Sequence, residues 1–204
     1  MSVGIDLAQI EPGFTDPVFG SQSVFRAVMD AVARPGSISD LSFAPKPPTG
    51  LGRAAGAVAL TLFDFETAVW LDPTLSDGAV QAWLRFHCGC PITANPQEAA
   101  FAVAGAANKA PPLSDFNIGD AKYPDRSTTL ILEVAAMRGG APVTLRGPGI
   151  KGEIEISPVG LSADFWRQFA ENGAQFQFGV DVLLVAGDQL MALPRSTRAS
   201  TEGA

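Results

Sequence analysis

The sequence predicts an α/β protein built around a mixed β-sheet. Segments with the apolar spacing of helices alternate along the 204 residues with short apolar runs typical of buried strands. Tight turns at Gly139-Gly140 and Gly187-Asp188 each join two strand-like segments, so part of the sheet should be antiparallel. The length fits one domain, which can bury a large core without a disulfide or a metal.

Four segments carry the pattern expected of helices. Residues 19–33 repeat apolar side chains at helical spacing, and residues 54–63 are small and apolar nearly all round. A third helix should begin after Asp77 and a fourth after Ser162, because both residue types cap helices. Gly173 should end the fourth. The apolar stripes are Phe25, Val28, Met29 and Val32 in the first helix, Val80, Trp83, Leu84 and His87 in the third, and Phe165, Trp166 and Phe169 in the fourth.

The strand-like segments lie between and after these helices. Residues 128–134 form the clearest buried strand, unbroken apart from Glu133, and residues 180–185 form a second. Shorter strands are expected at 68–71, 101–103, 143–145, 154–156 and 190–193. Residues 104–126 contain several glycines and prolines and predict a long loop, a feature that is usually functional or mobile.

The chain divides into one domain with short extensions. Residues 1–17 predict an extended N-terminal arm, residues 18–196 a single α/β domain, and residues 197–204 a flexible polar tail. The N-terminus lacks the pattern of a signal peptide, and no apolar stretch approaches the roughly 20 residues needed to span a bilayer. These features favour a cytoplasmic protein that does not contact the membrane.

The composition favours association with other proteins. Only 17% of the residues are charged, against about 25% in an ordinary soluble domain, which indicates that protein covers part of the surface. The net charge of −7 gives no general electrostatic basis for binding nucleic acid.

The same counts limit the chemistry that one chain can perform. It has one histidine and two cysteines, too few for a histidine-based metal cluster or for the four thiolates of an iron–sulfur cluster. The four lysines, at positions 46, 109, 122 and 151, lie in loop-like stretches unsuited to a pyridoxal phosphate Schiff base. We therefore expect no catalytic residue, no metal and no cofactor.

The segment His87-Cys88-Gly89-Cys90 has two interpretations. One imidazole, two thiolates and a carboxylate could hold a metal, although this is no standard zinc spacing. The favoured interpretation is a helix end with small buried cysteines and a histidine near the C-terminal dipole.

Three arginines stand at the ends of predicted elements. Arg146 precedes Gly147-Pro148-Gly149, a turn whose backbone N–H groups could cradle an anion. Arg34 precedes Pro35-Gly36, and Arg195 precedes two hydroxyl residues that could help it bind a phosphate or a partner carboxylate. The alternative for each is a surface arginine that contacts solvent or a helix-terminal carbonyl.

Asp181 stands out because it lies in the apolar segment Phe178–Leu183. A carboxylate there must face solvent, accept hydrogen bonds from backbone donors or pair with an arginine. Arg85 and Arg146 are candidate partners for a buried pair, and the sequence does not choose between these arrangements.

Several of these pieces, taken in order, resemble the PhnH subunit family of the bacterial carbon–phosphorus lyase system. They extend over about residues 18–197, and their order and spacing make the resemblance specific. The pieces are Phe25-Arg26, Arg34-Pro35-Gly36, Leu60-Thr61-Leu62, Val69-Trp70-Leu71, Leu84-Arg85-Phe86-His87, Phe101-Ala102-Val103, Thr129-Leu130-Ile131-Leu132, Gly147-Pro148-Gly149-Ile150, Phe178-Gly179-Val180-Asp181 and Leu193-Pro194-Arg195-Ser196-Thr197.

The resemblance implies more than the residues alone predict. It implies a three-layer αβα sandwich similar to the large domain of pyridoxal-phosphate-dependent transferases, without that cofactor. It also implies a homodimer and membership of a core complex with the PhnG, PhnI and PhnJ subunits. That complex transfers phosphonate to the ribose of a nucleoside triphosphate and then cleaves the carbon–phosphorus bond, with the radical step in PhnJ.

Two functions follow from the sequence and the resemblance. The favoured one is an accessory subunit of this phosphonate-processing complex. The alternative is a small-molecule-binding or catalytic subunit that holds a phosphonate or a nucleotide phosphate in an arginine-lined cleft. That cleft would be formed by Arg85, His87 and Arg146, with help from Arg34, Arg195 and Asp181. The alternative requires these side chains to converge in one pocket.

Overall fold

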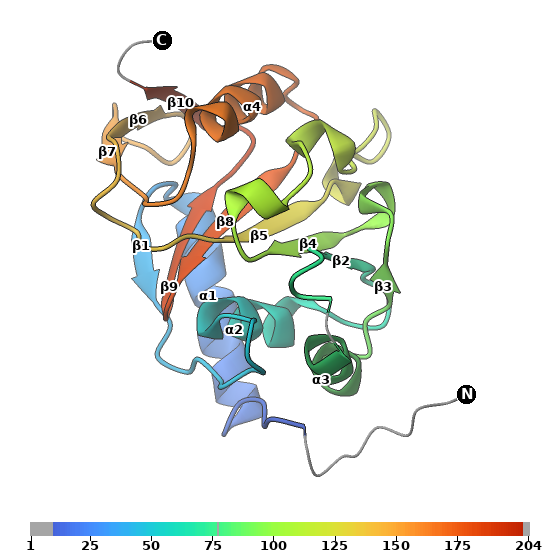
Figure 1. The fold of residues 1–204 in the computed structure, drawn as a ribbon. Helices are drawn as coiled ribbons and strands as arrows, with labels where there is room; N and C mark the ends of the chain where they lie inside the picture. The colour runs from blue at the N-terminus through green and yellow to red at the C-terminus, as the bar shows by residue number, and fades with distance from the viewer. Residues whose placement is uncertain (1–9, 77, 202–204) are drawn as a thin grey trace.

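A seven-stranded mixed sheet forms the centre of the molecule (Figure 1). The computed structural model describes residues 10–76 and 78–201. Strands β3, β2, β4, β5 and β8 run parallel, whereas β9 is antiparallel to β8 and β1 is antiparallel to β9. The predicted mixed sheet is therefore confirmed. In spatial order the strands are β1 (Ile38–Asp40), β9 (Gln189–Leu193), β8 (Asp181–Ala186), β5 (Thr129–Glu133), β4 (Phe101–Ala104), β2 (Val69–Leu71) and β3 (Ile92–Thr93).

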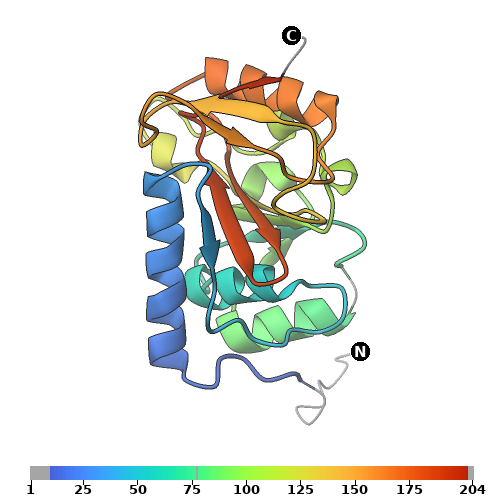
Figure 2. The ribbon, with the colours of Figure 1, turned by 90° about the vertical axis from the view of Figure 1, so that its left-hand side faces the viewer.

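Different elements cover the two faces of this sheet (Figures 1 and 2). On one face lie α1 (Pro17–Ala33), α2 (Arg53–Leu62) and α3 (Gly78–Cys88). On the other lie α4 (Ala163–Ala174) and a three-stranded antiparallel sheet of β10 (Arg198–Thr201), β6 (Val143–Arg146) and β7 (Ile154–Ile156). The second outer layer thus combines a helix with a small sheet. The described helices include none of sufficient length and apolarity to span a membrane.

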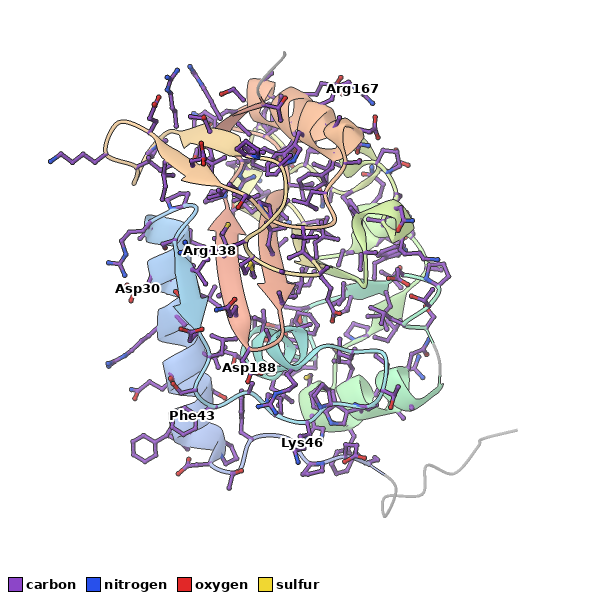
Figure 3. The ribbon with its side chains drawn as sticks, turned by 60° about the vertical axis from the view of Figure 1, so that its left-hand side comes forward. Asp30, Phe43, Lys46, Arg138, Arg167 and Asp188 are labelled. Atoms are coloured by element: carbon purple, nitrogen blue, oxygen red, sulfur yellow. The ribbon has the colours of Figure 1, made fainter. Side chains whose placement is uncertain are left out.

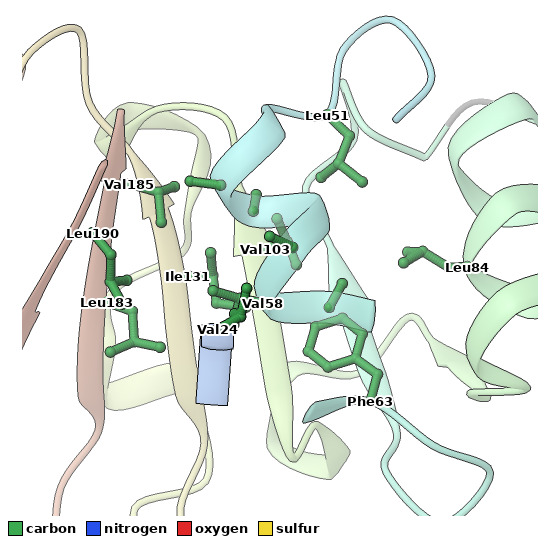
Figure 4. Packing of buried hydrophobic residues seen from close by; sticks show 14 of the residues in the cluster. Val24, Leu51, Val58, Phe63, Leu84, Val103, Ile131, Leu183, Val185 and Leu190 are labelled. Carbon is green, nitrogen blue, oxygen red and sulfur yellow. The ribbon is translucent and has the colours of Figure 1, made fainter. Parts of the chain in front are cut away.

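The central strands supply two cores because successive strand residues point to opposite faces. Val103, Ile131, Leu183 and Val185 belong to the cluster that packs against α1, α2 and α3 (Figure 4). The residues between them belong to the second cluster, with Phe165, Trp166 and Phe169 of α4; they are Ala102, Ala104, Leu130, Leu132, Val182 and Leu184. The apolar runs of β5 and β8 are explained by this two-sided burial.

One of the two predicted helix caps can be compared with the structure. The Ser162 hydroxyl accepts a hydrogen bond from Phe165 N at 3.2 Å, which confirms it as the cap of α4. Asp77 lies outside the described residues. Gly173 is inside α4 and does not end it, because the helix continues to Ala174.

The structure contains elements that the sequence did not predict. Strands β1 and β3 are short edge strands, and β10 lies where we expected a flexible tail beginning at residue 197. Residues 198–201 pair with β6, which gives this polar segment backbone partners. The long loop at 104–126 contains the short 3₁₀ helices η3 (Ala107–Lys109), η4 (Leu113–Asp115) and η5 (Pro124–Arg126), and η2 (Pro96–Glu98) precedes β4.

The turn after β6 packs closely against the end of α1. Gly149 has a φ of +81°, and a Cβ there would overlap the carbonyl oxygen of Ala33 and lie 2.8 Å from Pro35 Cδ.

We expect Gly149→Ala to destabilise the fold by about 1–3 kcal/mol, since it adds backbone strain and a backbone clash. Urea unfolding measures the loss, with Gly152→Ala as control. Gly152 has a similar φ of +77° but nothing near its Cβ position, so equal losses would contradict the packing argument.

Candidate functional site

The outer face of α1 carries an exposed apolar stripe. Val18, Phe25, Met29 and Val32 are 75%, 49%, 55% and 43% exposed, and at about 100° per residue they fall within about 60° around the helix axis. Figure 2 shows α1 at the edge of the molecule, with no other element drawn against its outer side. Such a contiguous exposed apolar stripe is typical of a protein-interaction surface.

The sequence placed this stripe on the wrong side of the helix. We predicted that Phe25, Val28, Met29 and Val32 form one inward face, but only Val28 is buried. The buried residues of α1 are instead Gly20, Val24, Val28 and Ala31. The apolar arc of this helix is too wide for a helix with one buried face, and that width was the signal for a second contact surface.

A polar pair lies at the C-terminal end of α1. Arg34 Nη2 lies 3.2 Å from Asp30 Oδ2, and both side chains are more than half exposed. An ion pair this exposed contributes at most about 1 kcal/mol to stability.

Arg195 and Asp181 form the most enclosed ion pair of the described residues. Arg195 Nη1 donates to Pro124 O at 2.9 Å, Ser127 Oγ at 2.8 Å and Gly179 O at 2.9 Å. Its Nη2 lies 3.3 Å from Asp181 Oδ2, and its backbone N–H donates to Asp181 Oδ1 at 2.7 Å. These contacts connect three loops, and the guanidinium group makes its hydrogen bonds within the protein. This indicates a structural role for Arg195.

The partner of Asp181 is therefore neither Arg85 nor Arg146. The β8–β9 hairpin determines the pairing that is observed. Val182 lies opposite Leu193, so Asp181 and Arg195, just beyond this pair, lie near each other. Arg146 instead pairs with Glu153 through both its Nε, at 3.0 Å, and its Nη2. This second pair is more than half exposed.

Arg85 and His87 lie elsewhere, at the end of α3. Arg85 is exposed. The His87 ring is tilted by 60° against the Trp83 ring, with the ring centroids 4.9 Å apart, and its Nε2 lies 3.0 Å from Glu11 O. Trp83 Nε1 donates to the same carbonyl oxygen at 2.8 Å. These two rings hold the N-terminal arm against α3, so His87 has a positioning role for residue 11.

The six residues proposed from the sequence do not form one cleft. Arg34, Arg146, Arg195 and Asp181 are on segments at the β6 end of the molecule, whereas Arg85 and His87 are on α3. Figure 1 shows α3 and β6 on opposite faces of the central sheet, and the two elements contribute to different core clusters. The arginine-lined cleft of the alternative function is not present in this arrangement.

The Cys88 Sγ donates to Ala59 O at 3.6 Å and the Cys90 Sγ donates to Leu84 O at 3.9 Å. The neighbouring Cys90 thiol and burial raise the pKa of the Cys88 thiol, whereas the Cys88 thiol lowers the pKa of Cys90. Cys90 is buried in the core beside α3. Within residues 10–76 and 78–201, no three His, Cys, Asp or Glu side chains are grouped as metal ligands would be.

The sequence reasoning missed two carboxylates at the carboxyl edge of the parallel strands. Asp72 follows β2 and is fully buried; its Oδ1 accepts from Thr74 N at 2.6 Å and its Oδ2 accepts from Gly105 N at 2.6 Å. Glu133 ends β5 and accepts a 2.5 Å hydrogen bond from Gly52 N, which precedes α2. Glu133 is the single charged residue in an otherwise apolar strand, and this interruption could have identified it as a buried carboxylate from the sequence.

Burial raises the pKa of the Glu133 carboxyl, with a smaller contribution from the Asp72 charge, while the Gly52 hydrogen bond opposes the rise. The folded state therefore holds a proton on Glu133 more tightly than the unfolded state, and stability falls as pH rises through this raised pKa. We expect Glu133→Gln to lose that component of the pH dependence while keeping an acceptor for Gly52. Urea unfolding of both proteins from pH 4.5 to 8 measures this. A wild-type protein that gains stability over the variant as pH rises would contradict the prediction.

Comparison with known proteins places the chain in a family. A family model described as "Bacterial phosphonate metabolism protein (PhnH)" matches residues 12–200. The chain belongs to the PhnH family. The matched region includes α1, the Arg195–Asp181 pair and β10 up to residue 200.

Two named relatives support this membership. The chain is 47% identical to "Alpha-D-ribose 1-methylphosphonate 5-triphosphate synthase subunit PhnH" of Rhizobium meliloti (strain 1021), over 196 residues that cover 96% of this chain and 98% of the relative. It is 29% identical to "Putative C-P lyase subunit protein HtxG" of Stutzerimonas stutzeri, over 188 residues that cover 90% and 87% of the two chains. The resemblance to the PhnH family is thus confirmed.

Proposed function

We propose that this chain is an accessory subunit of a carbon–phosphorus lyase core complex in organic phosphonate catabolism. In that complex it supports transfer of methylphosphonate to the ribose of a nucleoside triphosphate. The bond from the ribose to the nucleobase breaks, the nucleobase leaves, and ribose 1-methylphosphonate 5-triphosphate forms. The observation that carries the proposal is the 47% identity, over nearly the whole of both chains, to a PhnH subunit named for this synthase.

The surface of the chain supports a role in assembly. The α1 stripe of Val18, Phe25, Met29 and Val32 is a contact surface for other protein, and the low charged fraction agrees with such coverage. The partners we propose are the PhnG, PhnI and PhnJ subunits. In the isolated protein a second copy of the chain would cover the stripe and form a homodimer.

Two further expectations remain proposals. The mixed sheet with α1, α2 and α3 on one face and α4 on the other agrees with the proposed similarity to the large domain of pyridoxal-phosphate-dependent transferases, without the cofactor. A cytoplasmic location also stays a prediction.

Reconstitution tests the proposed function. PhnG, PhnI and PhnJ are incubated with methylphosphonate and a nucleoside triphosphate, with and without this chain, and the product is followed by phosphorus NMR. We expect ribose 1-methylphosphonate 5-triphosphate to form much faster when the chain is present. Equal rates in the two mixtures would contradict an accessory role.

A further inference from the structure

A surface cleft of about 290 Å³ lies between the N-terminal arm and the loop that follows β1. Residues 12–15 form one wall, residues 42–46 form another, and Arg53 lies at the start of α2. None of the six candidate site residues that the sequence analysis proposed lines this cleft. Its chemistry is therefore independent of the separated arginines described above.

Two cations line this cleft. Lys46 is exposed and makes no ion pair with any residue in the described part of the chain. Arg53 Nε binds Asp188 Oδ1 at 2.6 Å and its Nη2 donates to Ala44 O at 3.3 Å. Its Nη1 has no acceptor among the described residues. Figure 3 shows Lys46 on the loop beside the arm, on the same side of the molecule as Asp188.

Two hydroxyl groups line the same space. Thr15 and Ser42 are both exposed on the walls of the cleft, and neither hydroxyl has a hydrogen-bond partner among the described residues. The adjacent Asp16 carboxylate is directed to α1, where Oδ1 accepts from Val18 N and Phe19 N at 3.1 Å. The cleft therefore offers cationic and hydroxyl donors, while its nearest carboxylates are engaged with other groups.

The arm that forms one wall is held in place before any ligand binds. Trp83 Nε1 and His87 Nε2 lie at hydrogen-bonding distance from the Glu11 carbonyl, just ahead of the cleft residues. The Phe14 ring packs on Gly20 of α1, where a Cβ would lie 2.8 Å from it. Such anchoring lowers the ordering cost of binding.

The position of the cleft in the fold also suits a ligand. Arg53 begins α2 at the carboxyl end of β5, where Glu133 accepts the hydrogen bond of Gly52 N. Ligands of open α/β sheets bind outside the carboxyl ends of the strands.

We propose that this cleft binds a tetrahedral phosphorus oxyanion, either a phosphate or a phosphonate group. Such a group presents three oxygens and a charge of up to −2, which match the donors of a lysine, a free guanidinium nitrogen and two hydroxyls. A carboxylate, with two oxygens and a charge of −1, matches these donors less well. The inference goes beyond the accessory role and does not rest on it, because the cleft is complete within one chain.

Calorimetric titration of the full chain tests the proposal with methylphosphonate, inorganic phosphate and tripolyphosphate as separate ligands. We expect saturable one-site binding of at least one of them. The ligand that binds most tightly shows whether the cleft takes a phosphonate, a free phosphate or a polyphosphate. Lys46→Ala should weaken this binding about tenfold, because it removes a charge-assisted hydrogen bond. Thr15→Val should weaken it about threefold without changing the charge.

The matched control is Lys151→Ala, which removes an exposed lysine from the turn between β6 and β7. Its affinity should equal that of the wild-type chain. Absence of binding for all three ligands would overturn the proposal, and so would an equal loss in Lys151→Ala or undiminished binding in Lys46→Ala. A failed reconstitution of the complex would leave these outcomes unaffected, so the two proposals fail separately.

Discussion

Replacing Phe25 and Met29 by aspartate should weaken subunit association by about 100-fold or more. Burying a large apolar side chain contributes roughly 1.5–3 kcal/mol, and each tenfold change in affinity corresponds to about 1.4 kcal/mol. Both side chains are half exposed in the isolated chain, so the fold does not depend on their complete burial. Sedimentation velocity of the double variant, alone and with its proposed partners, measures the loss of association.

A matched control separates the α1 stripe from exposed aromatics in general. Phe86 on α3 is 52% exposed, close to the 49% of Phe25, and α3 lies away from α1 in Figure 1. Phe86→Asp should leave association unchanged. If it weakens association as much as the α1 variant does, the assignment of α1 as the contact surface is wrong.

Arg195→Ala should destabilise the folded chain by about 3 kcal/mol. The substitution leaves the Asp181 carboxylate without its cation and the carbonyls of Pro124 and Gly179 without a donor, and removing one partner of an enclosed pair is costly. The Arg195 and Asp181 side chains are only 17% and 30% exposed, so solvent replaces little of the loss. Chemical denaturation at pH 7 gives the change in unfolding free energy.

Arg146→Ala is the comparison for this result. Its pair with Glu153 is 66% and 57% exposed, so the loss should stay within about 0.5 kcal/mol. If Arg195→Ala and Arg146→Ala lose equal amounts of stability, the enclosure of the Arg195–Asp181 pair does not determine its contribution to stability.

The sequence predicted the elements that bury continuous apolar surface. β5 and β8 were recognisable because both of their faces are covered, and α2 because it is packed nearly all round. β10 was missed because its pairing with β6 compensates for a polar, half-exposed sequence that has no apolar alternation. Its existence depends on a partner strand more than 50 residues earlier, which local patterns do not reveal.

The candidate sites were less predictable for a related reason. That Asp181 would accept from backbone donors or pair with an arginine was among the sequence expectations, and counting outward from the Gly187-Asp188 turn places it opposite Pro194, next to Arg195. Lys46 and Arg53 carried no local signal, since the cleft forms only when the arm packs beside the loop after β1. The α1 stripe was visible as a pattern, but amphipathicity alone does not say which arc faces the core.

Sedimentation equilibrium of the wild-type chain, co-expressed with PhnG, PhnI and PhnJ, tests the central claim most directly. The account predicts one species that contains this chain together with the other subunits. It also predicts that the Phe25→Asp/Met29→Asp variant is absent from that species while its own circular dichroism stays native. A wild-type chain that sediments alone, with the other three subunits assembled without it, would contradict the account.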